Sequence, residues 1–241
     1  MELLPAVHAA LFGSSSPTDL IATAGRALVL GHVFWIIAYG LILACSARSR
    51  LLGIPLAAII LNVTWEALLY TNCPGVGPRD LCGPALSGEW SLVLSFILGL
   101  DILLLAQAFV LIAASSGLAR TALFFVVALI VVWLLHSNVI GRTLDYRGLV
   151  DSWIVNAVMS GLFVRLALSR PNGEGLSFLA AIAKLLGSQM VTLGLWIAPD
   201  PYAMTDIRAA VVYGLAVAVA VLDIWYVLIL WRRLPAADRV A

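Results

Sequence analysis

Four ionisable side chains stand inside long apolar stretches of the sequence, where a charged group is costly and is therefore a functional candidate. They are Glu66, Asp101, Lys184 and Asp223. Helical rise along the expected spans places Glu66 and Asp101 about 20 to 22 Å from the cytoplasmic end, and the other two about 12 Å from it. The spacing predicts a carboxyl pair in one layer and an ion pair in the other. An alternative for Lys184 is that its amine extends to the membrane interface.

The carboxyl pair suggests proton chemistry. Two carboxyl groups close together in a poorly solvated site cannot both ionise cheaply, so at least one of Glu66 and Asp101 is expected to hold its proton at neutral pH. A buried, neutral carboxylic acid is what a general acid requires. Asn62 and Tyr70 lie four residues before and after Glu66, on the same helix face, and can orient it. The alternative is that each acid only hydrogen-bonds a neighbouring helix.

Aromatic side chains lie beside these acids. Trp65 precedes Glu66, Trp225 lies two residues after Asp223, and Tyr226 follows Trp225. Aromatic faces attract cations. Proton donors combined with aromatic walls would suit a chamber that generates and guides carbocations.

The elements that must position these residues are membrane-spanning helices. The 241 residues are 63% hydrophobic and 11% charged, whereas soluble domains average about 25% charged residues. A span needs roughly 20 apolar residues. Seven segments qualify: 27–47, 51–71, 90–114, 119–137, 148–168, 176–198 and 208–231. We predict an all-α fold, a polytopic integral membrane protein with seven transmembrane helices in one bundle and a single domain (1–241), preceded by a short interfacial helix within residues 1–24.

Arginine placement orients this bundle. Eight arginines fall on one side of the predicted spans and five on the other, which favours an external N-terminus and a cytoplasmic C-terminus. The composition is typical of a bacterial source, so we expect the bacterial plasma membrane. The connector 72–89 then lies outside, where Cys73 and Cys82 either form a disulfide or remain two unpaired loop cysteines.

Several function classes are disfavoured by what the sequence lacks. A net charge of +1 without any basic run argues against nucleic-acid binding. No CxxC motif or His/Cys cluster indicates a metal site. No DDxxD or NDxxD motif is present to hold a magnesium-bound diphosphate. We therefore expect no metal and no cofactor.

An ordered set of motifs extends over nearly the whole chain. The spans contain NVTWEALLY, WSLVLSFILGLDILL, VDSWIVNAVMSGLFVRLALSR, GLSFLAAIAKLLG and VLDIWYVLILW. The order Trp-Glu, Leu-Asp, Asn-x-x-Met-Ser, Lys-x-x-Gly and Leu-Asp-x-x-Tyr resembles the small seven-helix transmembrane terpene cyclases of meroterpenoid and indole-terpenoid biosynthesis. The resemblance begins at Trp35 and Tyr39 in the first span and ends at Tyr226 in the last.

The resemblance implies an isomerase that protonates a terminal alkene or epoxide of a prenylated aromatic or indole substrate. Cationic polyene cyclisation follows without loss of diphosphate. The implied catalytic acids are Glu66 and Asp223. We predict substrate-binding side chains at Asp101, Asn62, Trp65, Tyr70, Asn156, Tyr226, Lys184, Trp35 and Tyr39. The expected partners are a lipophilic prenylated small molecule and the lipid bilayer. Prenyl length, head group, epoxide or alkene, the first proton donor and the oligomeric state stay open.

A small proton- or ion-coupled transporter is the alternative, since buried acids also bind ions. No inverted repeat or pair of broken helices favours it. A retinal photoreceptor would need a lysine on the last span, whereas Lys184 lies on the sixth.

Overall fold

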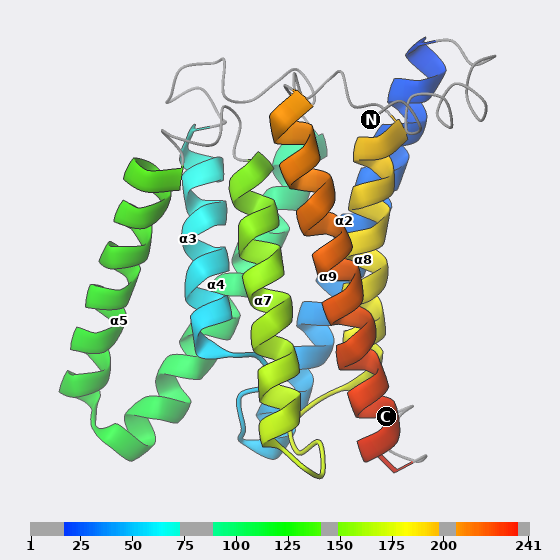
Figure 1. Cartoon of the computed structure of the whole chain (residues 1–241). Helices are drawn as coiled ribbons and strands as arrows, with labels where there is room; N and C mark the ends of the chain where they lie inside the picture. The colour runs from blue at the N-terminus through cyan, green and yellow to red at the C-terminus, as the bar shows by residue number, and fades with distance from the viewer. Residues whose placement is uncertain (1–16, 73–88, 141–148, 198–205, 236–241) are drawn as a thin grey trace.

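The computed structural model describes residues 17–72, 89–140, 149–197 and 206–235 (Figure 1). These residues form helices and short connections, and no β-strand occurs among them, which confirms the predicted all-α class. The helices are α2 (Pro17–Ser49), α3 (Leu56–Asn72), α4 (Glu89–Ser116), α5 (Leu118–Leu134), α7 (Leu149–Ser169), α8 (Phe178–Ile197) and α9 (Asp206–Arg233), with a π-helical turn, η2 (Leu135–Ile140), continuing α5. Cys73 and Cys82 lie outside the described residues.

Six of the described helices are long and apolar enough to cross a membrane, and α3 is the exception. Its 17 residues span roughly 25 Å, against a hydrocarbon core of about 30 Å. The predicted start of this span at residue 51 is wrong, because residues 51–55 are not helical. Pro55 lacks an amide hydrogen and restricts the residue before it. The segment instead folds back on α2, where the Gly53 amide donates to Ser46 Oγ at 2.8 Å.

The first long helix begins earlier than the sequence indicates. The prediction that residues 17–24 belong to a separate interfacial helix is wrong, because they form the first turns of α2. Apolar and small residues continue from there into the predicted span without a helix breaker, so the helix has no reason to stop. The remainder of the expected interfacial segment, residues 1–16, lies outside the described part of the chain.

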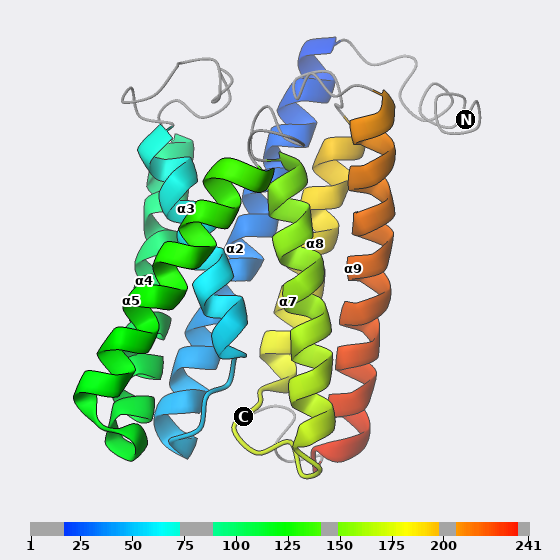
Figure 2. The same cartoon turned by 60° about the vertical axis from the view of Figure 1, so that its left-hand side comes forward.

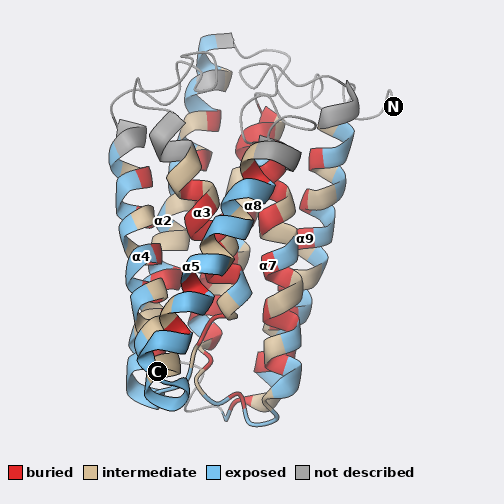
Figure 3. Cartoon of the chain, turned by 90° about the vertical axis from the view of Figure 1, so that its left-hand side faces the viewer, coloured by how far each residue is buried: buried red, intermediate tan, exposed pale blue. Residues whose placement is uncertain are grey.

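Six helices form a closed ring. Helix α2 packs against α8, α8 against α9, α9 against α7, α7 against α3, α3 against α4, and α4 returns to α2 (Figures 1 and 2). Helix α5 lies outside the ring, in contact with α3 and α4. Most of its surface is exposed (Figure 3), with large apolar side chains such as Leu123 at 67% exposure. The ring therefore surrounds the core, and α5 adds an apolar outer layer.

Close packing of α2 on α8 determines where the aromatic side chains of α2 lie. A Cβ atom on Gly187 would lie 2.7 Å from Trp35 Cδ1 and 2.9 Å from the backbone oxygen of Gly31. Only glycine allows this approach, as at other small-residue contacts between apolar helices. The approach brings Trp35 against α8 about one turn from Lys184.

Most of the arginines in the described part of the chain lie at one end of the bundle. The C-termini of α2 and α9, the α4–α5 turn and the α7–α8 connection lie at the same end (Figure 1). Arg48, Arg120, Arg170 and Arg232 belong to these four places. Arg26 and Arg208 lie in the N-terminal parts of α2 and α9, at the opposite end. Four other arginines of the predicted asymmetry, Arg79, Arg142, Arg147 and Arg239, lie outside the described residues.

Candidate active site

Three helices of the ring bring a group of four polar side chains together, which we call the carboxyl cluster: Tyr39, Asn62, Glu66 and Asp101. The Asn62 Nδ2 atom donates to Glu66 Oε1 at 3.0 Å and to Asp101 Oδ2 at 2.5 Å. It lies 2.9 Å from Tyr39 Oη. All four side chains are buried. The predicted pairing of Glu66 with Asp101 is confirmed.

The carboxyl cluster needs more hydrogens than the amide can supply. Three oxygen atoms surround Asn62 Nδ2, but an amide nitrogen carries two hydrogens. The carboxyl groups of Glu66 and Asp101 both approach this one nitrogen, and two ionised carboxylates have no hydrogen to share with each other. Among the described residues, neither group forms an ion pair with a basic side chain. The geometry therefore accommodates a proton held between two acids.

Two carboxyl oxygens of this cluster lack a hydrogen-bond partner within the described part of the chain. Glu66 Oε2 and Asp101 Oδ1 are buried and have no hydrogen-bond partner among the described residues. An unsatisfied buried acceptor costs about 1–3 kcal/mol. The two oxygens are therefore suited to exchange a proton with a bound molecule.

A second group, the ion-pair cluster, consists of Ser160, Lys184 and Asp223 from α7, α8 and α9. Lys184 Nζ donates to Asp223 Oδ1 at 2.5 Å and to Ser160 Oγ at 2.7 Å. Lys184 is 1% exposed and Asp223 0%, so the alternative that Lys184 extends to an interface is wrong. The predicted Lys184–Asp223 ion pair is confirmed.

Aromatic rings connect the two clusters. Trp35 lies 5.4 Å from the Tyr39 ring, and Lys184 Nζ lies 5.2 Å from the Trp35 ring centroid. Lys184 Nζ is also 5.7 Å from the Phe163 ring, and Phe163 lies 5.3 Å from Tyr226. These rings belong to one hydrophobic core. The predicted residues Trp35, Tyr39 and Tyr226 therefore line one region, whereas Phe163 was missed because a phenylalanine in an apolar span resembles any core residue.

The remaining predicted residues have different outcomes. Trp65 is half-buried and packs against the same core. Asn156 donates to Ser188 Oγ at 3.2 Å, while its buried Oδ1 has no partner among the described residues. The side chain of Tyr70 lies outside the described part of the structure.

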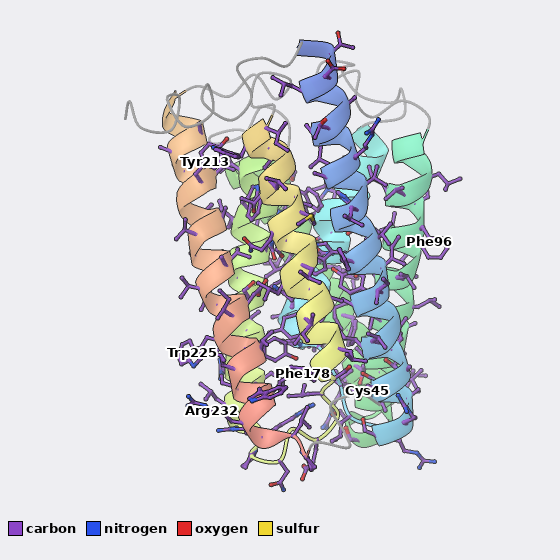
Figure 4. The ribbon with its side chains drawn as sticks, turned by 90° about the vertical axis from the view of Figure 1, so that its right-hand side faces the viewer. Cys45, Phe96, Phe178, Tyr213, Trp225 and Arg232 are labelled. Carbon is purple, nitrogen blue, oxygen red and sulfur yellow. The ribbon has the colours of Figure 1, made fainter. Side chains whose placement is uncertain are left out.

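The suggested cation-stabilising role of Trp225 is wrong. Its side chain is 49% exposed and points away from the bundle, as Phe96 does on α4 (Figure 4). Residues two positions apart on a helix project in nearly opposite directions. Since Asp223 faces inward, Trp225 must face outward.

A buried histidine–aspartate pair was also missed. His136 Nδ1 lies 2.9 Å from Asp151 Oδ1 and 2.8 Å from Asp151 Oδ2. His136 is 2% exposed and Asp151 5%. His136 lies near the end of a predicted span, so the criterion that selected the four intramembrane charges would have found it if extended to histidine.

Comparisons with known proteins add no relative: no protein-family model, curated protein or solved structure matches this chain. Within the described residues, no group of three or more His, Cys, Asp and Glu side chains could hold a metal ion. The function must therefore be inferred from the two clusters and the rings between them, which together can supply a proton, a buried ion pair and aromatic faces.

Proposed function

We propose that this protein is an integral membrane terpene cyclase that works by protonation. Its substrate is a prenylated aromatic or indole compound with a terminal alkene or epoxide, and cyclisation proceeds without loss of diphosphate. The observation that carries this proposal is the carboxyl cluster, in which two buried acids meet at the Asn62 amide, and neither forms an ion pair with a basic side chain among the described residues. Only a bound proton relieves that arrangement.

The membrane setting is supported by the helices and their outer surface. Six apolar helices are long enough to span a bilayer. We propose α3 as the seventh span, completed by the non-helical residues 51–55. Exposed apolar side chains such as Phe96 and Leu123 would then face lipid, and the arginine-rich end would face the cytoplasm, with the N-terminus outside the plasma membrane. A lipophilic prenyl substrate reaches such a site from the bilayer.

In the proposed mechanism Glu66 is the proton donor. It transfers its proton to the terminal alkene carbon or the epoxide oxygen, and the resulting cation is attacked by successive double bonds of the prenyl chain. Asn62 and Asp101 hold the Glu66 carboxyl in place. A second proton, on Asp101, stays with the pair after the transfer, so that two carboxylates are not left together. The cation then passes aromatic faces of the kind that Trp35 and Tyr226 provide.

Asp223 has a different role in this proposal. Its Oδ1 atom is already engaged by Lys184 at 2.5 Å. Its other oxygen, Oδ2, is buried without a hydrogen-bond partner among the described residues, and the negative charge on this oxygen favours a cation beside it. This charge stabilises intermediates after Glu66 has started the reaction.

The experiment uses membranes from cells that express the chain. They are incubated with 3-farnesyl- and 3-geranylgeranyl-indoles and prenylated phenols, each with a terminal alkene or a terminal epoxide. Chromatography with mass spectrometry should detect a product of unchanged mass and altered retention. Glu66→Gln should reduce its formation at least about 100-fold, in the range that general acids contribute. Trp225→Phe, which alters an outward-facing side chain, is the matched control and should behave as wild type.

Two results would contradict the proposal. If no isomeric product forms from any of these substrates, or if Glu66→Gln cyclises as wild type does, Glu66 is not the acid of a cyclase. Uptake of an unaltered compound by proteoliposomes, abolished in Glu66→Gln, would instead favour the proton-coupled transporter.

A further inference from the structure

The pair formed by His136 and Asp151 plays no part in the mechanism above. His136 Nδ1 contacts both oxygens of the Asp151 carboxyl. His136 Nε2 is buried and has no hydrogen-bond partner among the described residues. A buried ring nitrogen without a partner costs about 1–3 kcal/mol, so this atom indicates a site for a group that the described side chains do not supply.

The pair joins elements that carry the proposed active site. His136 lies on the π-helical turn η2, which contacts α3, the helix of Glu66. Asp151 lies in the first turn of α7, the helix of Ser160 and Phe163. In Figure 2 the chain of α5 runs past α3 towards the first turns of α7.

The geometry determines which nitrogen can act as a base. The Asp151 carboxylate accepts a hydrogen bond from His136 Nδ1, and this contact places the hydrogen of the neutral imidazole on Nδ1. The lone pair is then on Nε2, the buried and unpartnered atom. When Nε2 takes up a proton, the imidazolium is stabilised by the Asp151 carboxylate beside it.

We infer that His136 Nε2 is the base that removes the proton at the end of the cyclisation, with Asp151 as the positioning residue. This inference rests on the proposed function. In the step, a C–H bond next to the final carbocation breaks, its electron pair forms the C=C bond of the product, and the proton moves to Nε2. One proton enters from Glu66 and one leaves to His136, so no oxidant, reductant or other reactant is needed.

The decisive variant is His136→Asn, assayed on the prenylated indole or phenol that the wild-type protein cyclises. The asparagine amide can still donate to Asp151, but nothing replaces Nε2. Substrate should still be consumed, because Glu66 is intact. The share of the wild-type product should fall at least about tenfold, in favour of other alkene isomers and alcohols formed by water capture. Ser137→Ala, next to His136, is the control and should leave the product composition unchanged.

Asp151 is tested by a change of product rather than by a loss of protein. Asp151→Asn should shift the product composition in the same direction as His136→Asn, since an amide can stabilise the other imidazole tautomer. Asp151→Glu should restore much of the wild-type composition. A pair that only joins η2 to α7 would change the amount of folded protein and leave the products unaltered.

The outcomes separate this inference from the proposed function. If His136→Asn forms the same product mixture as the wild type, the inference is overturned and the proposed cyclase function is unaffected. If the wild-type protein itself does not cyclise any substrate, both are overturned. If His136→Asn does not accumulate in membranes, the wild-type protein is given substrate deuterated at the carbon that loses the proton. Over many turnovers, loss of the deuterium to water supports a separate base. If the deuterium instead appears in later product molecules, at the position that Glu66 protonates, a single acid performs both steps. That result overturns the inference.

Discussion

The carboxyl cluster and the ion-pair cluster handle buried charge in opposite ways. In the ion-pair cluster, the Asp223 carboxylate is matched by Lys184, whose amine also donates to Ser160. In the carboxyl cluster, Glu66 and Asp101 meet around a neutral amide. A buried ion pair tolerates ionised groups because each charge offsets the other. Two acids without a cation can be buried together only if a proton stays with them.

This difference separates two properties that a cyclase requires. A carboxyl group that keeps its proton can donate it to a substrate. A carboxylate paired with a lysine has no proton to donate and can act on a substrate only through its negative charge. The two clusters are joined by Trp35, which contacts Tyr39 on one side and Lys184 on the other. Substitutions that are expected to have different effects on stability and activity in the two clusters are therefore the best tests of this comparison.

The largest effect on stability is expected from Lys184→Met. This change leaves the buried Asp223 carboxylate without its partner and should lower the free energy of unfolding by about 3–5 kcal/mol. Unfolding of the purified protein in detergent measures it. Adding Asp223→Asn should recover most of the loss, because replacing both members of a buried pair is often neutral. Glu66→Gln replaces one neutral group with another and should cost about 1 kcal/mol or less. Equal losses in Lys184→Met and Glu66→Gln would contradict the distinction between the clusters.

The next largest effect on stability is expected at the contact between α2 and α8, where Trp35 lies between the two clusters. Gly187→Ala puts a Cβ atom 2.7 Å from Trp35 Cδ1 and 2.9 Å from the backbone of Gly31. We expect a loss of about 1–3 kcal/mol from overpacking, measured in the same unfolding assay. At Gly214 nothing lies within 4 Å of an added Cβ, so Gly214→Ala should be neutral or stabilising by up to about 1 kcal/mol. Similar behaviour of the two alanine variants would show that α2 and α8 are not closely packed.

A smaller effect, on activity alone, is expected from Asp101→Asn. The amide keeps the shape of the side chain but removes the second acid, so Glu66 no longer shares a proton with a carboxyl neighbour. Product formation should fall about tenfold, while the free energy of unfolding changes by about 1 kcal/mol or less. Product yield per amount of membrane protein is the measurement. Unchanged yield would mean that Glu66 does not need Asp101.

The smallest effect is expected from Tyr39→Phe. It removes only the hydroxyl that lies 2.9 Å from Asn62 Nδ2, a contact worth about 1 kcal/mol. Product formation should fall about fivefold at most, with the ring contact to Trp35 retained. A loss as large as that of Glu66→Gln would instead give Tyr39 a direct part in the proton transfer.

Much of this architecture could be predicted from residue types and their spacing. The positions of the long apolar stretches predicted the ends of most helices within a few residues, because a helix in lipid must be apolar throughout. Polar exceptions such as Glu66 and Lys184 were conspicuous for the same reason. Their grouping into pairs followed from helical rise, since the four helices that carry these charges, α3, α4, α8 and α9, are α-helical throughout. Pro55 shows the limit of prediction from apolar stretches. Helix α3 begins only after this residue, although the residues before it are apolar enough to belong to a span.

The sequence by itself determined that the chain is helical, that its helices are apolar and that four charges lie within them. Only the tertiary structure decided that Asn62 bridges Glu66 and Asp101, that Trp225 faces outward, and that His136 meets Asp151. These facts depend on how each helix is rotated about its own axis and on how closely neighbouring helices approach, as in the close contact of Gly187 with Gly31. Composition sets which surfaces avoid water, but packing against several neighbours at once sets which side chains meet.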